Sequence, residues 1–153
     1  MAKDIFAKDK KKIERALQYS MQDLAEEAAG VLTRISPIQT GEYIRSFTAG
    51  ITKQKLGNVP RKEPINTGHM SQTTKASLRE SEKEKLARRL KGLVTRLPGK
   101  TISIGNIAGH ALIVELLGWP KSPPYHTFSR AILYLEGRKK QICRKAVKRA
   151  FKI

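Results

Sequence analysis

The titratable side chains are the first place to look for chemistry, because catalysis needs acids, bases or nucleophiles held close together. Three histidines occur, His69, His110 and His126, and their spacing matches no metal-ligand motif. The 13 acidic residues form no recognisable catalytic pair, and the sequence has no P-loop, no G-x-S-x-G and no G-x-G-x-x-G motif. The sequence therefore predicts a protein that is not an enzyme and that binds no cofactor or metal.

Glu115 is the one charged residue inside the apolar run from Ala111 to Leu117. A carboxylate buried without a partner is strongly destabilising, so its surroundings matter. Two interpretations stay open. In the first, Glu115 faces solvent from a short amphipathic helix. In the second, it pairs with an Arg or Lys, which makes it a candidate contact to a neighbouring subunit.

The charge balance points to an electrostatic partner. Lys and Arg number 31 against 13 acids, so the net charge is +18, which favours nucleic acid, an anionic membrane or an acidic protein. Residues 137–153 hold eight cations and no acid: Arg138, Lys139, Lys140, Arg144, Lys145, Lys148, Arg149 and Lys152. This segment is either a solvated helix face or a contact to DNA or an acidic partner. No base-reading motif accompanies it, so any contact with DNA is expected at phosphate.

Apolar residues at three- and four-residue steps predict a first helix over residues 9–35. Ser36-Pro37 ends this helix, because the residue before a proline avoids the helical region. Residues 1–8 are expected as an arm or as an extra helical turn. A turn at Thr40-Gly41 then leads into the next element.

The rest of the chain alternates between strand and helix patterns. Alternating residues predict a strand over 42–53, and a segment rich in Gly, Pro and Asn predicts a loop over 56–70. The later patterns predict a helix over 71–94, a strand over 101–105, a short buried helix over 108–117 and a last helix over 126–152. The stretch from Thr101 to Trp119 has no Lys or Arg, which is typical of the buried middle of a domain.

The length fits one domain over residues 1–153. Its 39% hydrophobic and 6% aromatic content is lean for a freestanding globule and leaves room for faces that neighbouring subunits complete. A single cysteine excludes an internal disulfide framework. No run approaches the ~20 apolar residues of a membrane span, so the protein is expected to be soluble, to have no membrane partner and to be made in a cytoplasm.

Two short motifs, far apart in the sequence, carry the strongest functional signal. The first motif spans residues 36–46 and resembles the pattern S-P-x-x-T-G-x-L-R-x-S, with matches at Ser36, Pro37, Thr40, Gly41 and Ser46. Tyr43 stands where the pattern usually has Leu, and Ile44 stands where it usually has Arg, with Arg45 one place late. The second motif spans residues 110–118 and resembles Y-A-x-x-V-E-x-G, with matches at Ala111, Val114 and Glu115. His110 replaces the aromatic residue, and one extra residue precedes Gly118. With the order of elements, these motifs resemble the tailed-phage tail-completion or neck protein family of the HK97 type, related to the lambda minor tail protein Z.

The resemblance implies an α+β domain in which a small antiparallel sheet is packed by a long N-terminal helix and the basic C-terminal helix. It also implies a structural virion protein that completes the tail or joins head to tail as a ring, commonly a hexamer, around the DNA channel. Its partners would be its own copies, neck, connector, tail-tube or tail-terminator proteins, and packaged DNA through phosphate. It would assemble in the host cytoplasm and reside in the virion. The alternative, based on charge, is a free basic nucleic-acid-binding module associated with ribosomes or DNA.

Overall fold

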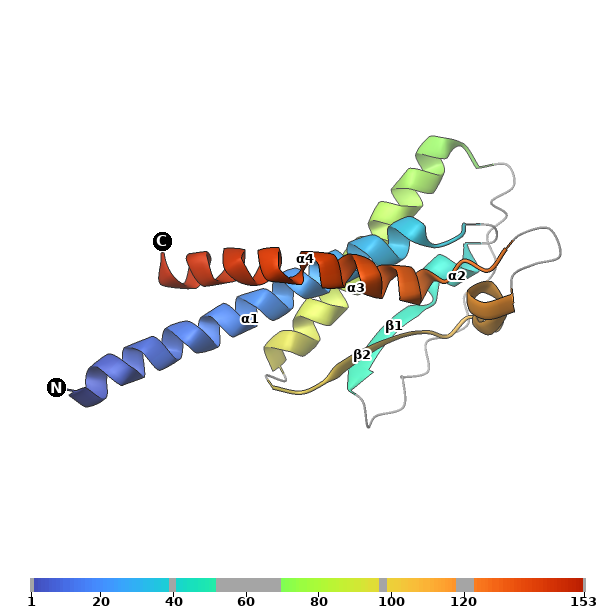
Figure 1. The fold of residues 1–153 in the computed structure, drawn as a ribbon. Coiled ribbons are helices and arrows are strands. Elements are labelled where there is room, and N and C mark those ends of the chain that lie inside the picture. The colour runs from blue at the N-terminus through green and yellow to red at the C-terminus, as the bar shows by residue number, and fades with distance from the viewer. Residues whose placement is uncertain (1, 39–40, 52–69, 97–98, 118–122, 153) are drawn as a thin grey trace.

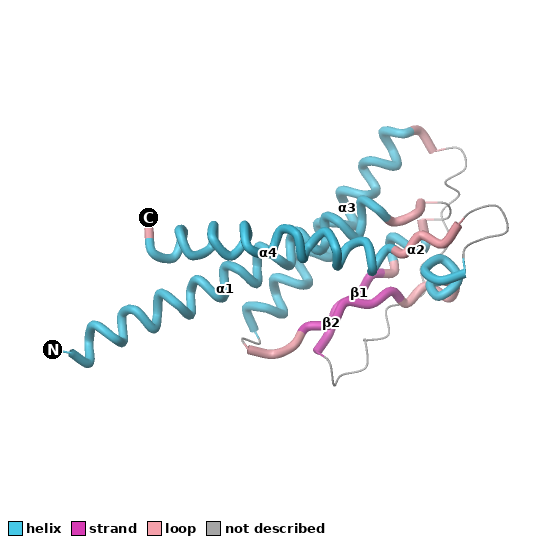
Figure 2. The backbone as a smooth tube through the Cα atoms, in the orientation of Figure 1, coloured by secondary structure: helices cyan, strands magenta, loops and turns pink. Residues whose placement is uncertain are grey.

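The computed structural model describes residues 2–38, 41–51, 70–96, 99–117 and 123–152. Long N-terminal and C-terminal helices pack together beside a two-stranded antiparallel sheet, so the protein has a mostly helical α+β fold (Figures 1 and 2). The fold class expected from the sequence is therefore confirmed.

The first helix, α1, spans Ala2–Ile35. The predicted helix over 9–35 is confirmed, and residues 2–8 extend the same helix instead of forming a separate arm. At its C-terminal end the Ser36 hydroxyl donates a hydrogen bond to the Leu32 carbonyl, which satisfies one of the free helix-end acceptors.

A short helix, α2, spans Glu42–Arg45, and strand β1 spans only Phe47–Ile51. The prediction of a strand over 42–53 is wrong for its first five residues, because 42–45 are helical and Ser46 lies in a turn. Gly41 adopts a left-handed conformation (φ 67°). The Ser46 hydroxyl donates a hydrogen bond to the Glu42 carbonyl at 2.7 Å, so local hydrogen bonds close a helical turn here. Thr40, residues 52–53 and residues 56–69 of the predicted loop lie outside the described residues.

Helix α3 spans Gln72–Arg96 and strand β2 spans Ile102–Asn106, which confirms both predicted elements. Ser71 caps α3, since its hydroxyl accepts a hydrogen bond from the Thr74 backbone N–H at 3.1 Å. The two strands pair antiparallel, with Phe47 opposite Asn106 and Ile51 opposite Ile102.

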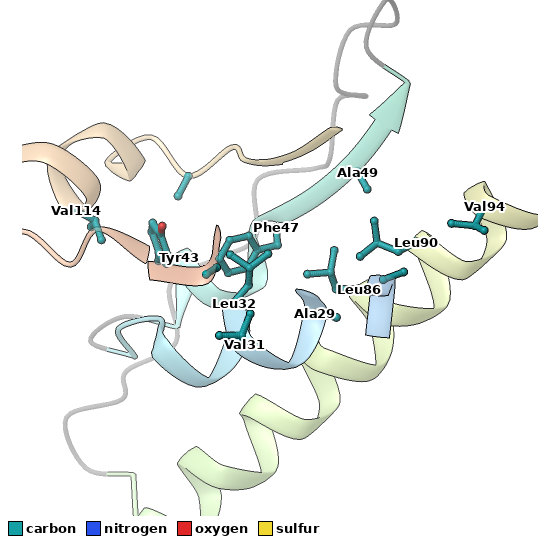
Figure 3. Packing of buried hydrophobic residues seen from close by; sticks show 13 residues of the cluster. Ala29, Val31, Leu32, Tyr43, Phe47, Ala49, Leu86, Leu90, Val94 and Val114 are labelled. Atoms are coloured by element: carbon teal, nitrogen blue, oxygen red, sulfur yellow. The ribbon is translucent and has the colours of Figure 1, made fainter. Parts of the chain in front are cut away.

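The core lies between the sheet and the second half of α1, with α3 packed against both. Figure 3 shows Leu32 of α1 and Leu86 and Leu90 of α3 converging beneath β1. The Tyr43 and Phe47 rings meet edge to face, 5.5 Å between centroids. Fixing Tyr43 in this way sets the direction in which its hydroxyl points.

A π-helical segment, η1, spans Ile113–Leu117, and residues 111–117 are helical as predicted. The expectation that this segment is buried is wrong, because only Val114 of η1 is buried, while Leu112, Leu116 and Leu117 are 65%, 61% and 72% exposed. The absence of Lys and Arg therefore accompanies a surface with exposed leucines in this part of the chain.

The last helix, α4, spans Thr127–Phe151, close to the predicted bounds. It runs back along α1, so that the C-terminus lies on the same side of the molecule as the N-terminus (Figure 1). Among the described helices, none combines the length and apolarity needed to cross a membrane.

Candidate functional site

The two motifs meet at Glu115. The Tyr43 hydroxyl of α2 donates a hydrogen bond to Glu115 Oε1, and the Phe128 backbone N–H, in the first turn of α4, donates to Glu115 Oε2 at 3.2 Å. Glu115 is partly buried and has both oxygens engaged inside the chain, so the solvent-facing interpretation is wrong. Within the chain the partners of Glu115 are a tyrosine hydroxyl and a backbone amide, and not the Arg or Lys of the second interpretation. A contact from Glu115 to another subunit stays a prediction.

The electrostatics favour this arrangement. Burial, and then the hydrogen bond to Glu115, raise the pKa of Tyr43 above its ordinary value of 10.0, while the Thr127 hydroxyl acts in the opposite direction. Tyr43 is therefore a neutral donor at physiological pH. His126 precedes α4 and gives it no side-chain cap, so the Glu115 carboxylate supplies the negative charge that a helix N-terminus favours.

The first motif builds the turn that presents Tyr43. Ser36 ends α1, Gly41 supplies the left-handed residue before α2, and Ser46 closes α2 onto the Glu42 carbonyl. Pro37 follows the end of α1 and is partly buried. Ser36, Gly41 and Ser46 thus have structural roles in the turn, and Tyr43 is the motif residue that reaches the second motif.

Two further residues hold this region together and carried no signal in the sequence. The Asn106 amide donates to the Tyr43 carbonyl at 2.8 Å and its oxygen accepts the Ala108 N–H at 2.9 Å. The Arg79 guanidinium, on α3, donates to the carbonyls of Arg34 and Ser36 and so satisfies the end of α1. Burial lowers the pKa of Arg79. No spacing rule connects either residue with the first motif, since both contacts come from tertiary packing.

The histidines do not assemble a catalytic centre among the described residues. His110 Nδ1 lies 3.5 Å from Glu42 Oε2, and the His110 ring lies beside Tyr43 with 6.4 Å between centroids. His126 is exposed before α4, and His69 is outside the described residues. Within the described ranges, no three His, Cys, Asp or Glu side chains are placed to hold a metal ion.

A hollow of about 660 Å³ lies between α1, α3 and α4, and its acids are all neutralised within the chain. They pair as Asp23 with Arg149, Glu26 with Lys91, Glu27 with Arg138 and Glu80 with Lys83. The hydrogen bond from Lys91 lowers the pKa of Glu26. Among its described lining residues, the hollow therefore offers no unpaired carboxylate for acid–base work. Three of the ion pairs join α1 to α3 or α4.

The basic residues of α4 fall into two groups. Arg138, Lys139 and Arg149 form ion pairs with Glu27, Glu136 and Asp23, and Arg149 also lies over the Tyr19 ring at 3.9 Å. The other five are exposed and form no ion pair with a described residue: Lys140, Arg144, Lys145, Lys148 and Lys152. Three basic residues of α4 thus form ion pairs within the chain, and the other five form an unpaired cationic surface.

No family model, curated protein or solved structure matches this chain. A functional proposal accordingly rests on the two motifs and on the geometry of the described residues.

Proposed function

We propose that this chain is a non-enzymatic structural protein of the tailed-phage virion, which completes the tail or joins head to tail as a ring around the DNA channel. The observation that carries the proposal is the hydrogen bond between Tyr43 and Glu115. Tyr43 lies within the first motif, at a position where the family pattern usually has Leu, and Glu115 is a matching residue of the second motif. The fold thus brings the segments that carry the two motifs into contact.

Exposed apolar side chains support assembly into a ring. Leu112, Leu116 and Leu117 are largely exposed around η1, and Ile13 and Leu17 are 60% and 62% exposed on α1. Apolar residues gathered on a surface mark interaction sites when they form a contiguous patch. Contacts of this kind repeated head to tail form a closed ring when the rotation between neighbouring subunits divides a full turn evenly. The resemblance makes a hexamer the expected order, in contact with neck, connector, tail-tube or tail-terminator proteins.

The test is to find the protein in particles. Purified virions of the phage that encodes it, labelled with gold-conjugated antibody, are expected to carry label at the head–tail junction or at one tail end. Quantitative mass spectrometry is expected to give several copies per particle, in a fixed ratio to the portal protein. A single copy per particle, or none, would contradict the proposal.

The five unpaired cations of α4 favour a second candidate, a free basic module that binds nucleic acid in the cell. The two candidates differ in location. A free module is expected to sediment with ribosomes or host DNA and to be missing from purified particles, whereas a structural subunit is expected to remain with the particles after nuclease treatment.

A further inference from the structure

The free ends of α1 and α4 form one paired structure, here called the basic projection, which consists of residues 8–20 and 139–152. Figure 1 shows these segments extending together away from the sheet. Ala16, Ile142 and Ala146 are buried, and Arg149 reaches across from α4 to Asp23 at 3.3 Å and to the Tyr19 ring. Nearer the two chain termini, the Lys12 ammonium lies 5.5 Å from the centroid of the Phe151 ring. The two helices are therefore held side by side along these segments.

The projection concentrates the charge of the protein. Residues 8–20 carry five cations and two acids, and residues 139–152 carry seven cations and no acid, so more than half of the net charge of +18 lies here. On α1, four exposed cations form no ion pair with a described residue: Lys8, Lys10, Lys11 and Arg15. With the five unpaired cations of α4 they make nine. Like charges held this closely repel one another unless a polyanion neutralises them.

The spacing of the unpaired cations suits an extended polyanion. Lys140, Arg144, Lys148 and Lys152 recur every four residues along α4, which corresponds to steps of about 6 Å. The cations on both helices cover a length of about 20 Å, which calls for a ligand with regularly repeated negative charges over that distance. The rings of Tyr19 and Phe151 are occupied by Arg149 and Lys12, so they are not presented as platforms for stacking bases.

We propose that the basic projection, with α1 contributing alongside α4, binds the phosphate backbone of double-stranded DNA without reading its sequence. This deepens the proposed function, on which it rests for the presence of DNA. An anionic membrane is the less suitable partner, because a helix on a membrane surface needs a broad apolar face. The projection exposes only Ile13, Leu17 and Val147 as large apolar residues among its described positions.

The experiment compares three quadruple Gln variants, each of which removes four positive charges. The first neutralises α1 at Lys8, Lys10, Lys11 and Arg15, and the second neutralises α4 at Lys140, Arg144, Lys145 and Lys148. The control removes four cations outside the projection that form no ion pair with a described residue: Lys75, Arg88, Arg89 and Arg130. Binding to two duplexes of unrelated sequence is measured by fluorescence anisotropy across a salt series, after circular dichroism has shown that each variant is folded.

For DNA binding through phosphate, the logarithm of affinity falls linearly with the logarithm of salt concentration, by about 0.9 per phosphate neutralised. The α1 and α4 variants are each expected to lower affinity at least tenfold, equally on both duplexes, and to flatten that slope, while the control stays close to wild type. A second readout uses Cys143, the single cysteine, which is exposed within the projection. Duplex DNA is expected to slow its reaction with iodoacetamide in the wild type and not in the α4 variant.

Three outcomes would overturn the proposal. If the α1 variant matches the control, α1 takes no part. If all three variants lose affinity equally, only net charge matters. If vesicles containing anionic lipid protect Cys143 and duplex DNA does not, the projection binds membranes. These results do not depend on whether the protein is found in virions. A protein that binds DNA through the projection but is absent from virions would contradict the proposed function and leave this inference standing.

Discussion

The hydroxyl of Tyr43 donates a hydrogen bond to the carboxylate of Glu115 from 72 residues away in the sequence. The same carboxylate accepts the Phe128 N–H, so one side chain joins α2, η1 and the start of α4. Hydrogen bonds to a charged group are stronger than those between neutral groups, especially when partly removed from water. The contact therefore holds the first turn of α4 close to α2 and η1.

Removing either partner is expected to destabilise the monomer. Tyr43→Phe and Glu115→Gln should each lower the free energy of unfolding by about 1–3 kcal/mol, because each weakens a hydrogen bond to a charged group. The double variant should lose less unfolding free energy than the sum of the two single variants, since the partners share one contact. Urea denaturation measures all three.

Tyr125→Phe is the matched control, because the Tyr125 hydroxyl has no hydrogen bond with a described residue. It should change the free energy of unfolding by less than about 0.5 kcal/mol, as substitutions away from specific contacts usually do. Additive effects of the two main substitutions would show that Tyr43 and Glu115 are not coupled.

Stability should fall at alkaline pH through Tyr43. Burial and the Glu115 hydrogen bond raise its pKa in the folded state above the ordinary value of 10.0, so the unfolded chain releases this proton first. The contribution of Tyr43 is fully present below about pH 10 and is lost as pH rises towards its folded-state pKa. The unfolding free energy of the wild type should therefore decrease more steeply above pH 10 than that of Tyr43→Phe. Equal slopes of unfolding free energy against pH for the wild type and Tyr43→Phe would contradict the raised pKa of Tyr43.

Replacing either of two glycines with alanine should change the stability of the protein, in opposite directions. Gly41 has a φ of 67°, so Gly41→Ala should destabilise the protein by about 1–2 kcal/mol through backbone strain. Gly92 lies inside α3, where an added Cβ meets nothing within 4 Å, so Gly92→Ala should stabilise it by about 0.5–1 kcal/mol. Thermal melts of the two variants should shift to opposite sides of the wild type. A Gly41→Ala melt at or above the wild-type temperature would mean that the turn tolerates a side chain.

The long elements were predictable because their signals are local. The apolar stripe of α1, the stop at Ser36-Pro37 and the basic α4 all follow from residues within a few positions of one another. The conversion of residues 42–45 into α2 was not predictable, because it depends on the left-handed Gly41 and on the burial of both Tyr43 and Ile44. The site was predictable only as two separate motifs. That Tyr43 meets Glu115 depends on tertiary packing, which leaves no periodic trace in the sequence.

The exposed leucines around η1 provide the sharpest test of assembly. Leu116 and Leu117 are 61% and 72% exposed, so replacing both with Glu removes little packing from the monomer and should leave its melting temperature within a few degrees of the wild type. The same change places two charges on this surface, which would be costly to bury between subunits. Incorporation into particles should therefore fall sharply. A matched pair, Gln72→Glu with Thr73→Glu, makes the same change of two negative charges at exposed positions outside η1 and should incorporate normally. Normal incorporation of the leucine variant would show that subunits meet through another surface.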